Sequence, residues 1–165
     1  MRQLTAKSII LLGSACLSSA AFAQNREQQI ASCTSGDPKT LAEKVAGCTA
    51  LIASGQESGE NLAVIFNNRG NGYDDQNDFA HAIADYNESI RYNSQNPTAY
   101  LNRGLSYSFH HEYSRAVADL NEAIRLNPGY AKAYLARGQA QRHLGKAAEG
   151  DADTARGCAL NPGMC

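Results

Sequence analysis

The sequence repeats itself with a period of 34 residues from Ala63 almost to its end. Five columns of like residues keep this spacing through three copies, a register that chance rarely produces. A fixed period of this length marks a repeat architecture, in which each unit buries its apolar face by stacking on its neighbours. We therefore divide this part of the chain into units 63–96, 97–130 and 131–164. The columns are Gly70, Gly104 and Gly138; Arg69, Arg103 and Arg137; Phe66, Tyr100 and Tyr134; Asp85, Asp119 and Asp153; and Asn93, Asn127 and Asn161.

Each unit has the pattern of two helices joined by a turn. In the second unit, apolar and small residues recur at helical steps from Tyr100 to Tyr107, and a second apolar stripe runs from Tyr113 to Leu126. Pro97 suits the first position of a helix, where no backbone N–H is needed. The segment 127–129, Asn-Pro-Gly, ends the second helix. The sequence therefore predicts an all-α protein.

Small residues predict how the two helices of a unit meet. The glycine at the eighth position of each unit and an alanine of the second helix, Ala82 or Ala116, let the two backbones approach closely. Unit three has Gly150 in place of this alanine and carries Gly157 further along. Because glycine costs about 1 kcal/mol against alanine inside a helix, we expect the last helix to be weak.

At these positions the chain resembles the tetratricopeptide repeat family. The resemblance covers residues 63–164 and implies a right-handed α-solenoid of three helix-turn-helix repeats with a concave groove that binds partner segments, and not an enzyme. The Asn-Arg-Gly variant of the pattern resembles repeats of bacterial exported proteins. Unit three departs from the family at Gln141, Gly150 and Thr154. Unit two matches best, with Tyr100, Arg103, Gly104, Tyr107, Ala116, Leu120 and Pro128.

The resemblance also implies which residues line the groove. They belong to the first helix of each unit and would make a groove that is acidic at unit one, apolar in the middle and basic at unit three. An extended protein or peptide segment is the expected occupant. The predicted partner-binding residues are Asn67, Asn71, Leu101, Asn102, Leu105, Lys132, Leu135, Gln139 and Arg142.

Some members of the family clamp a C-terminal carboxylate at five positions of this groove. Asn71, Asn102 and Lys132 match three of them, whereas Asn67 and Ala136 stand where the family has lysine and arginine. Because two of the cations are missing, the attraction for a carboxylate is much reduced. We therefore favour an asparagine-rich solvated face over a clamp.

The arginine and aspartate columns predict ion pairs. We favour a ladder of Arg–Asp pairs that ties successive hairpins together, with an anion-binding row of arginines as the alternative. Partly buried pairs of this kind act more as conformational pins than as net stabilisers. The test is an Asp85→Ala variant, whose unchanged melting would contradict the ladder.

The histidines give the alternative function, a small-ligand or metal-binding periplasmic protein. His110, His111 and His143 fall at equivalent helix turns, where neutral imidazoles could bind a transition metal, but solvated histidines are the favoured interpretation. We find no combination of nucleophile, base and acid that predicts an enzyme, and we expect no cofactor. The 15 basic and 16 acidic residues do not favour nucleic-acid binding.

Residues 1–23 have the pattern of a secretory signal peptide. Arg2 and Lys7 precede an apolar run over 8–17, and the segment 21–23, Ala-Phe-Ala, predicts cleavage after Ala23. The run is too short to span a bilayer of about 30 Å. A retained anchor and a lipid on Cys16 are the alternatives. We expect a periplasmic or secreted protein with no membrane span after cleavage.

Residues 24–62 precede the repeats and predict a capping helix over 38–54, followed by a polar linker over 55–61. After cleavage four cysteines remain, and an even number in an exported protein favours disulfides. Two local pairs are favoured, Cys33–Cys48 and Cys158–Cys165, and free or mispaired thiols are the alternative for the second pair. At the C-terminal end, either the second bridge closes the last unit or its exposed face meets another chain, which would give self-association. We weigh these two equally.

Overall fold

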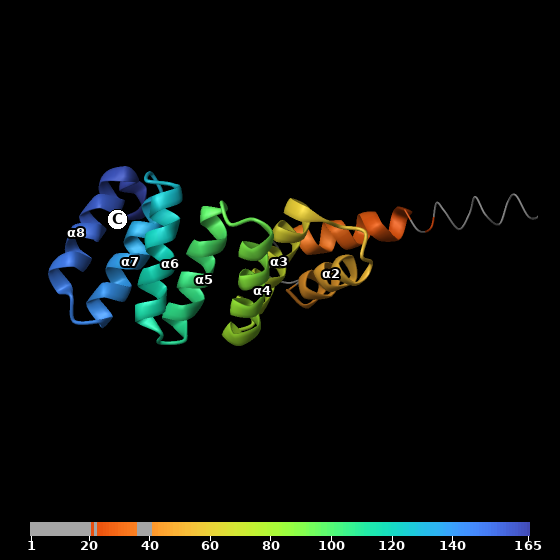
Figure 1. Cartoon of the computed structure of the whole chain (residues 1–165), viewed down its shortest axis with the longest axis horizontal. Helices are drawn as coiled ribbons and strands as arrows, with labels where there is room; N and C mark the ends of the chain where they lie inside the picture. The colour runs from red at the N-terminus through yellow and green to blue at the C-terminus, as the bar shows by residue number, and fades with distance from the viewer. Residues whose placement is uncertain (1–20, 22, 36–40) are drawn as a thin grey trace, which may run out of the picture.

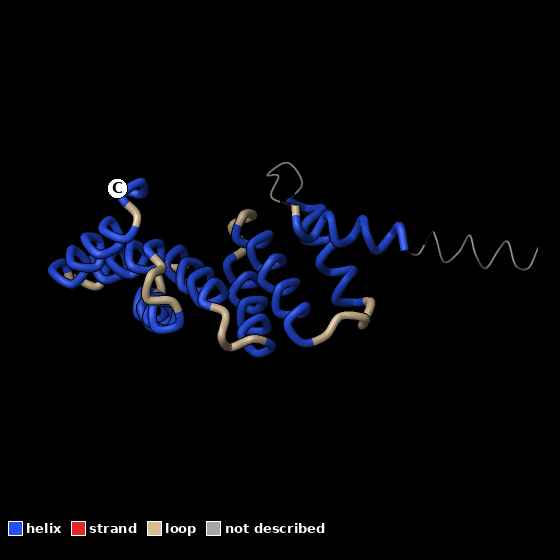
Figure 2. The backbone as a smooth tube through the Cα atoms, turned by 90° about the horizontal axis from the view of Figure 1, so that it is seen from above, coloured by secondary structure: helices blue, strands red, loops and turns tan. Residues whose placement is uncertain are grey.

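The computed structural model describes residues 21, 23–35 and 41–165, and all regular elements in that part of the chain are helices (Figure 2). The predicted signal peptide lies, apart from Ala21 and Ala23, outside the described residues. Within them, no helix combines the length and the apolar character that a membrane crossing needs. The all-α prediction is confirmed.

The three repeat units form three helical hairpins that follow one another along the molecule (Figure 1). The second helix of each unit packs against the first helix of the next, which confirms the α-solenoid. Helix α3 begins before Ala63, inside the segment predicted as a linker. The pairs are α3 (Gly59–Asp74) with α4 (Phe79–Tyr92), α5 (Pro97–Phe109) with α6 (Tyr113–Leu126), and α7 (Ala131–His143) with α8 (Ala147–Leu160).

The asparagine column ends the second helix of every unit. Asn93, Asn127 and Asn161 each follow the last helical residue and have an extended backbone conformation. Each side-chain oxygen accepts a hydrogen bond from the backbone N–H two residues further on, at 3.0, 3.1 and 3.2 Å. This Asx turn makes a sharp stop that directs the chain into the next unit. The repeated asparagine is thus explained by backbone geometry.

The glycine column lies where the two helices of a unit touch. A Cβ atom on Gly104 would lie 3.0 Å from Cγ of Leu120, and one on Gly138 would lie 2.6 Å from the carbonyl oxygen of Gly150. In unit three the two backbones therefore meet glycine to glycine. Gly150, which departs from the family pattern, allows this closer approach.

A Gly150→Ala substitution should therefore destabilise the protein, although helix propensity alone favours alanine by about 1 kcal/mol. Its methyl group would meet the carbonyl of Gly138 at 2.6 Å, and relieving such overpacking typically costs about 1–3 kcal/mol. Urea unfolding followed by circular dichroism measures the change. Glu149→Ala, at an exposed position of the same helix, is the matched control. A more stable Gly150→Ala variant would contradict the close approach.

The segment before the repeats forms a hairpin of its own. Residues 23–34 are helical, an element that the sequence did not predict, and α2 (Leu41–Ala53) lies within the predicted capping helix. We call these two helices the N-terminal hairpin. Its helices approach closely at Gly47, where a Cβ would lie 2.8 Å from Cβ of Ser32. Helix α2 packs on α3 as α4 packs on α5, so the hairpin occupies the place of a preceding repeat (Figure 1).

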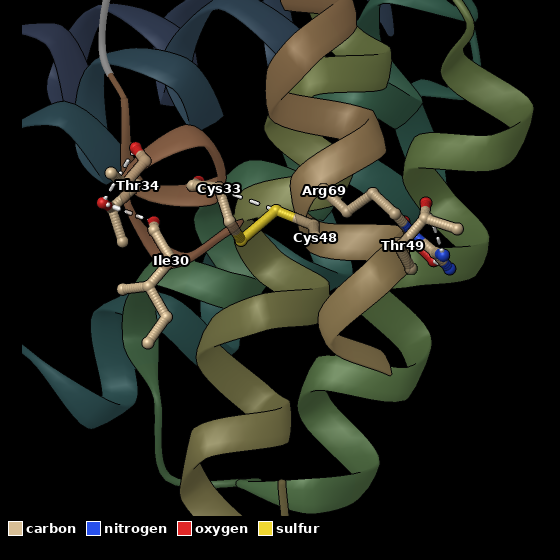
Figure 3. Close-up of a disulfide and its surroundings, with 8 residues drawn as sticks. Ile30, Cys33, Thr34, Cys48, Thr49 and Arg69 are labelled. Atoms are coloured by element: carbon tan, nitrogen blue, oxygen red, sulfur yellow. Dashed lines mark hydrogen bonds and ion pairs between the residues drawn. A yellow bond between two sulfur atoms is a disulfide. The ribbon is translucent and has the colours of Figure 1, made fainter. Parts of the chain in front are cut away.

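Two disulfides close the ends of the solenoid, in the pairing favoured from the sequence. Cys33 and Cys48 join the helices of the N-terminal hairpin, with their Cα atoms 4.7 Å apart (Figure 3). Both cysteines are buried against Leu51 and Ile65, so the bond is part of a small core. Cys158 and Cys165 join α8 to the residue that follows a short 3-10 helix, Pro162–Met164. Self-association through this end stays a prediction.

Candidate functional site

The first helices of the units share one face of the solenoid. Helix α3 contacts α5, and α5 contacts α7. We call the exposed surface along these three helices the groove face. It is the surface that the sequence predicts as the partner-binding site.

A network of polar side chains occupies the unit-one end of the groove face. Asn102 of α5 donates hydrogen bonds from Nδ2 to Oδ1 of Asn71 (3.0 Å) and Oδ1 of Asn67 (3.2 Å), both on α3. The buried Tyr86 donates from Oη to Asn71 (2.7 Å) and to Asp74 (2.8 Å). Asparagines that bond one another across two helices are held in place and link units one and two.

Asp74 gives this end of the groove face its negative charge. Ser106 of α5 donates a hydrogen bond of 2.7 Å to the carboxylate, which also accepts the bond from Tyr86. Burial raises the pKa of Asp74 above its ordinary value of 3.8, and the two hydrogen bonds offset only part of this rise. The pKa of Tyr86 is also raised, by burial and by the neighbouring Asp74, so its phenol stays a donor.

The raised pKa of Asp74 predicts how stability depends on pH. A group whose pKa is higher in the folded state stabilises the fold below its unfolded pKa, and this stabilisation is lost as pH rises through the folded pKa. An Asp74→Asn variant should therefore gain stability relative to the wild type as pH rises from about 3.9, the pKa of an unfolded aspartate, towards neutral. Thermal unfolding of both proteins across this range measures the difference. A constant difference would contradict the prediction.

The middle of the groove face is hollowed into a pocket of about 250 Å³ between units two and three. We call it the central pocket. Leu105, Ser108 and Phe109 come from α5, and Ala136, Gln139, Ala140 and His143 from α7, with His111 and Tyr113 closing the end at the turn. Its lining is mostly apolar, in agreement with the apolar middle expected from the sequence.

Pairs of stacked rings join successive units beside this pocket. Phe79 stacks on Phe109 with ring centroids 5.6 Å apart, and Tyr113 stacks on His143 at 4.4 Å with nearly parallel planes. In each pair, the first residue of the second helix of one unit contacts the last residue of the first helix of the next unit. The rings at the pocket wall are therefore held by a neighbour rather than free to rotate.

The predicted groove residues are not all accessible. Leu101 is a correction: it is only 1% exposed and lies in the core with Leu120, because position five of each unit faces the second helix. For the same reason Asn67 is buried, and Leu135 is half-buried against Gly157. Asn71, Asn102 and Leu105 are half-buried, and Lys132, Gln139 and Arg142 are exposed.

A second apolar pocket, of about 270 Å³, was missed by the sequence analysis. It lies where the N-terminal hairpin meets α3, and Ile30 and Val64 beside it are unusually exposed for large apolar residues. An ion pair between Arg26 and Glu57 lies at this pocket. Because half of its wall comes from the N-terminal hairpin, no signal in the 34-residue period pointed to it.

The Arg–Asp ladder needs a correction. Each arginine pairs with the aspartate of its own unit: in unit two, Nε and Nη2 of Arg103 donate to the carboxylate of Asp119 at 2.7 and 2.6 Å. The pairs 69–85 and 137–153 have the same geometry. The link to the preceding unit is a third bond, from Nη1 of Arg103 to Asn87 and of Arg137 to Asn121, both 2.7 Å.

These contacts leave the arginines little capacity for an anion. Hydrogen bonding to Asp85 raises the pKa of Arg69, and each arginine also lies over the aromatic ring three residues before it. Nη1 of Arg69 donates a hydrogen bond to Thr49 of α2 (Figure 3). This bond corresponds to those that Arg103 and Arg137 donate to an asparagine of the preceding unit. The arginine column therefore serves packing within and between units.

The turn histidines are not arranged as a metal site. The ring of Tyr113 stacks on His143, and its hydroxyl shares a 2.9 Å hydrogen bond with Nδ1 of His111. Nδ1 of His110 lies 3.0 Å from a carboxylate oxygen of Glu112. Across the described residues, no three histidine, cysteine, aspartate or glutamate side chains come together as metal ligands. No observation favours the metal-binding alternative.

A scaffold of stacked helical hairpins with one open face is the class of protein that this fold defines. Two family models, both describing the tetratricopeptide repeat, match residues 65–108 and 101–156. The chain belongs to the tetratricopeptide repeat family. No curated protein matches its sequence.

Solved structures of the same family share the fold. The first repeat domain of Spaghetti (RPAP3), bound to the HSP90 peptide SRMEEVD, is 30% identical with a TM-score of 0.63 over 66% of this chain and 86% of that one. The second repeat domain of human RPAP3, in complex with an HSP70 peptide, is 32% identical with a TM-score of 0.60 over 62% and 85%. MamA, at 19% identity and a TM-score of 0.67 over 77% and 75%, shares the fold.

Proposed function

We propose that this chain is a non-catalytic protein-interaction module that binds an extended segment of a partner protein along its groove face. The observation that carries the proposal is the central pocket, an apolar hollow on the face that the first helices share. The related domains at 30% and 32% identity hold peptides of HSP90 and HSP70, which supports a peptide as the ligand here.

The groove face differs in charge from a carboxylate clamp. Two clamp positions hold Asn67 and Ala136 in place of cations, and both residues are buried. Asn71 already accepts hydrogen bonds from Asn102 and Tyr86, and the carboxylate of Asp74 lies beside them. An anionic chain end would be repelled there. We therefore propose an internal segment of the partner, rather than its C-terminus, as the ligand.

The proposed setting is the bacterial periplasm, with the protein acting as an adaptor or assembly factor of the envelope. The predicted signal peptide supports export, and the two disulfides suit an oxidising compartment. A fusion of residues 1–30 to a reporter that is active only after export tests this part. A reporter that stays in the cytoplasm would contradict it.

Affinity capture from a cell-envelope extract tests the binding proposal. The bait is the chain from residue 24 onward, beside a Lys132→Glu/Gln139→Ala variant of the groove face and an Arg156→Glu control on the exposed side of α8. A specific partner should be retained by the wild type and the control and weakened about tenfold by the groove variant, which is about 1.4 kcal/mol. Equal capture by all three baits would contradict the groove as the binding surface.

A further inference from the structure

The two disulfides of the chain differ in how closely solvent can approach them. We propose that Cys158–Cys165 is a site of reversible thiol–disulfide exchange, which takes a thiol as its co-reactant, whereas Cys33–Cys48 is a purely structural bond. The exchange site lies at the end of α8, outside the groove face. The inference therefore goes beyond the proposed function, and its failure would leave partner binding along the groove face standing.

Solvent exposure separates the two bonds. Cys33 and Cys48 are 1% and 0% exposed, inside the small core of the N-terminal hairpin. Cys165 is exposed, Cys158 is half-buried, and every residue from 161 to 165 is exposed. Exchange requires an attacking thiolate to reach a sulfur atom. A thiolate can reach Cys165 in the folded chain, whereas it can reach the buried bond only after the hairpin opens.

The side of α8 that holds Cys158 differs from the same side of the earlier second helices. Asn121 of α6 accepts a hydrogen bond of 2.7 Å from Arg137, and so marks the side of α6 that faces the next unit. Ile124, about one turn further along, packs on the core that units two and three share. In α8 the same two positions hold Ala155 and Cys158. A disulfide therefore stands where the earlier units have contacts to a following unit.

The segment that the disulfide holds against α8 has few other ties. Asn161 ends α8, and the short 3-10 helix, Pro162–Met164, packs on it. In the described part of the chain, the backbone N–H groups of Gly163, Met164 and Cys165 bond only to Asn161 and Pro162. Opening the disulfide would therefore release this segment without breaking a hydrogen bond within the three hairpins.

The folded chain adds little protection to the Cys158–Cys165 bond. It joins residues seven apart in the sequence, against fifteen for Cys33–Cys48. In the chain-entropy model, a bond that closes a shorter loop adds less stability to the fold. Because the coupling between folding and bond formation is reciprocal, the fold also protects such a bond less against reduction. Disulfides that are exposed and weakly protected are the labile ones in proteins.

In the exchange step, an external thiolate attacks Sγ of Cys165 and forms a new S–S bond with it, while the bond to Sγ of Cys158 breaks. The electron pair leaves with Sγ of Cys158, which takes a proton from solvent and becomes a thiol. A second thiolate then attacks the external sulfur of this mixed disulfide, and Cys165 leaves and is protonated to a thiol. The two external thiols are thereby oxidised to a disulfide. A small monothiol or a protein dithiol can supply them.

Timed alkylation of the folded chain, residue 24 onward, tests the proposal. The oxidised protein is incubated with reduced glutathione or dithiothreitol in the absence of denaturant. Free thiols are trapped with N-ethylmaleimide and located by peptide mass spectrometry. We expect Cys158 and Cys165 to be trapped at least about 100-fold faster than Cys33 and Cys48, with little change in circular dichroism. Equal rates for the two pairs, or no trapped thiol until urea unfolds the chain, would overturn the exchange site.

The same reaction shows which sulfur is attacked and which thiol is preferred. Samples quenched with acid early in the glutathione reaction should carry glutathione on Cys165 and a free thiol on Cys158, and the reverse would overturn Cys165 as the attacked residue. A reduced protein dithiol with a C-x-x-C motif is compared with glutathione at equal thiol concentration, and the faster reaction identifies the preferred co-reactant. In a Cys158→Ala/Cys165→Ala variant, the Cys33–Cys48 bond should open as slowly as in the wild type. Faster opening would contradict two independent bonds.

Discussion

An Asp119→Ala substitution should lower the free energy of unfolding by about 3 kcal/mol. Asp119 is buried in the middle unit and accepts two short hydrogen bonds from Arg103. Without it, the guanidinium would stay packed over the ring of Tyr100 with its charge uncompensated. Breaking a buried pair from one side is costly because the remaining charge has lost both its partner and its water. Urea unfolding of the purified variant measures the loss.

Two further variants show whether burial of the Arg103–Asp119 pair causes this loss of stability. Glu122 forms an exposed pair with Arg125 on the same helix, and Glu122→Ala should leave the unfolding midpoint almost unchanged. An Arg103→Met/Asp119→Leu double variant should lose less than Asp119→Ala, since it leaves no buried charge behind. If Asp119→Ala and Glu122→Ala had equal effects, the aspartate column would have no structural role.

Removing the Cys33–Cys48 disulfide should have the next largest effect, a loss of about 3 kcal/mol for a loop of this length. A Cys33→Ala/Cys48→Ala variant keeps the small apolar core but frees the two helices in the unfolded chain. The effect should be local, because the N-terminal hairpin packs on α3, at the end of the solenoid away from α6. Amide hydrogen exchange should therefore become much faster in α2 and change little in α6.

The second disulfide is the matched comparison. Cys158 and Cys165 close a shorter loop at an exposed end, so a Cys158→Ala/Cys165→Ala variant should lose less stability, with faster exchange confined to α8 and the residues after it. If exchange in α2 were unchanged in the Cys33→Ala/Cys48→Ala variant, the N-terminal hairpin would be stable without its disulfide, which would contradict the prediction.

The sequence predicts the three repeat units well because the residues that recur every 34 positions are those that make the packing contacts. Gly104, Asn127 and Arg103 recur for reasons that each unit repeats: a close helix contact, a helix stop and an ion pair. The period also contains the reason for two corrections. Leu101 lies three residues before Gly104 and so shares its inward face, and Arg103 and Asp119, sixteen residues apart, belong to one hairpin.

The parts that the sequence does not predict depend on contacts outside a single unit. Residues 23–34 hold few apolar side chains, and the close contact of Gly47 with Ser32 gives no periodic signal. The central pocket arises from rings of two successive units. In each case the physical cause is a tertiary contact that local spacing does not encode.

Binding of a partner segment along α5 and α7 of the groove face is the central prediction for this protein. Titrating a peptide from a captured partner into the isotope-labelled chain and following the amide resonances of the chain tests this prediction directly. We predict shifts that concentrate on the central pocket, around Leu105, Phe109 and Gln139, and leave the exposed side of α6 and α8 near Arg125 and Ala152 unchanged. Shifts that concentrate near Arg125 and Ala152 and spare the pocket would contradict the account.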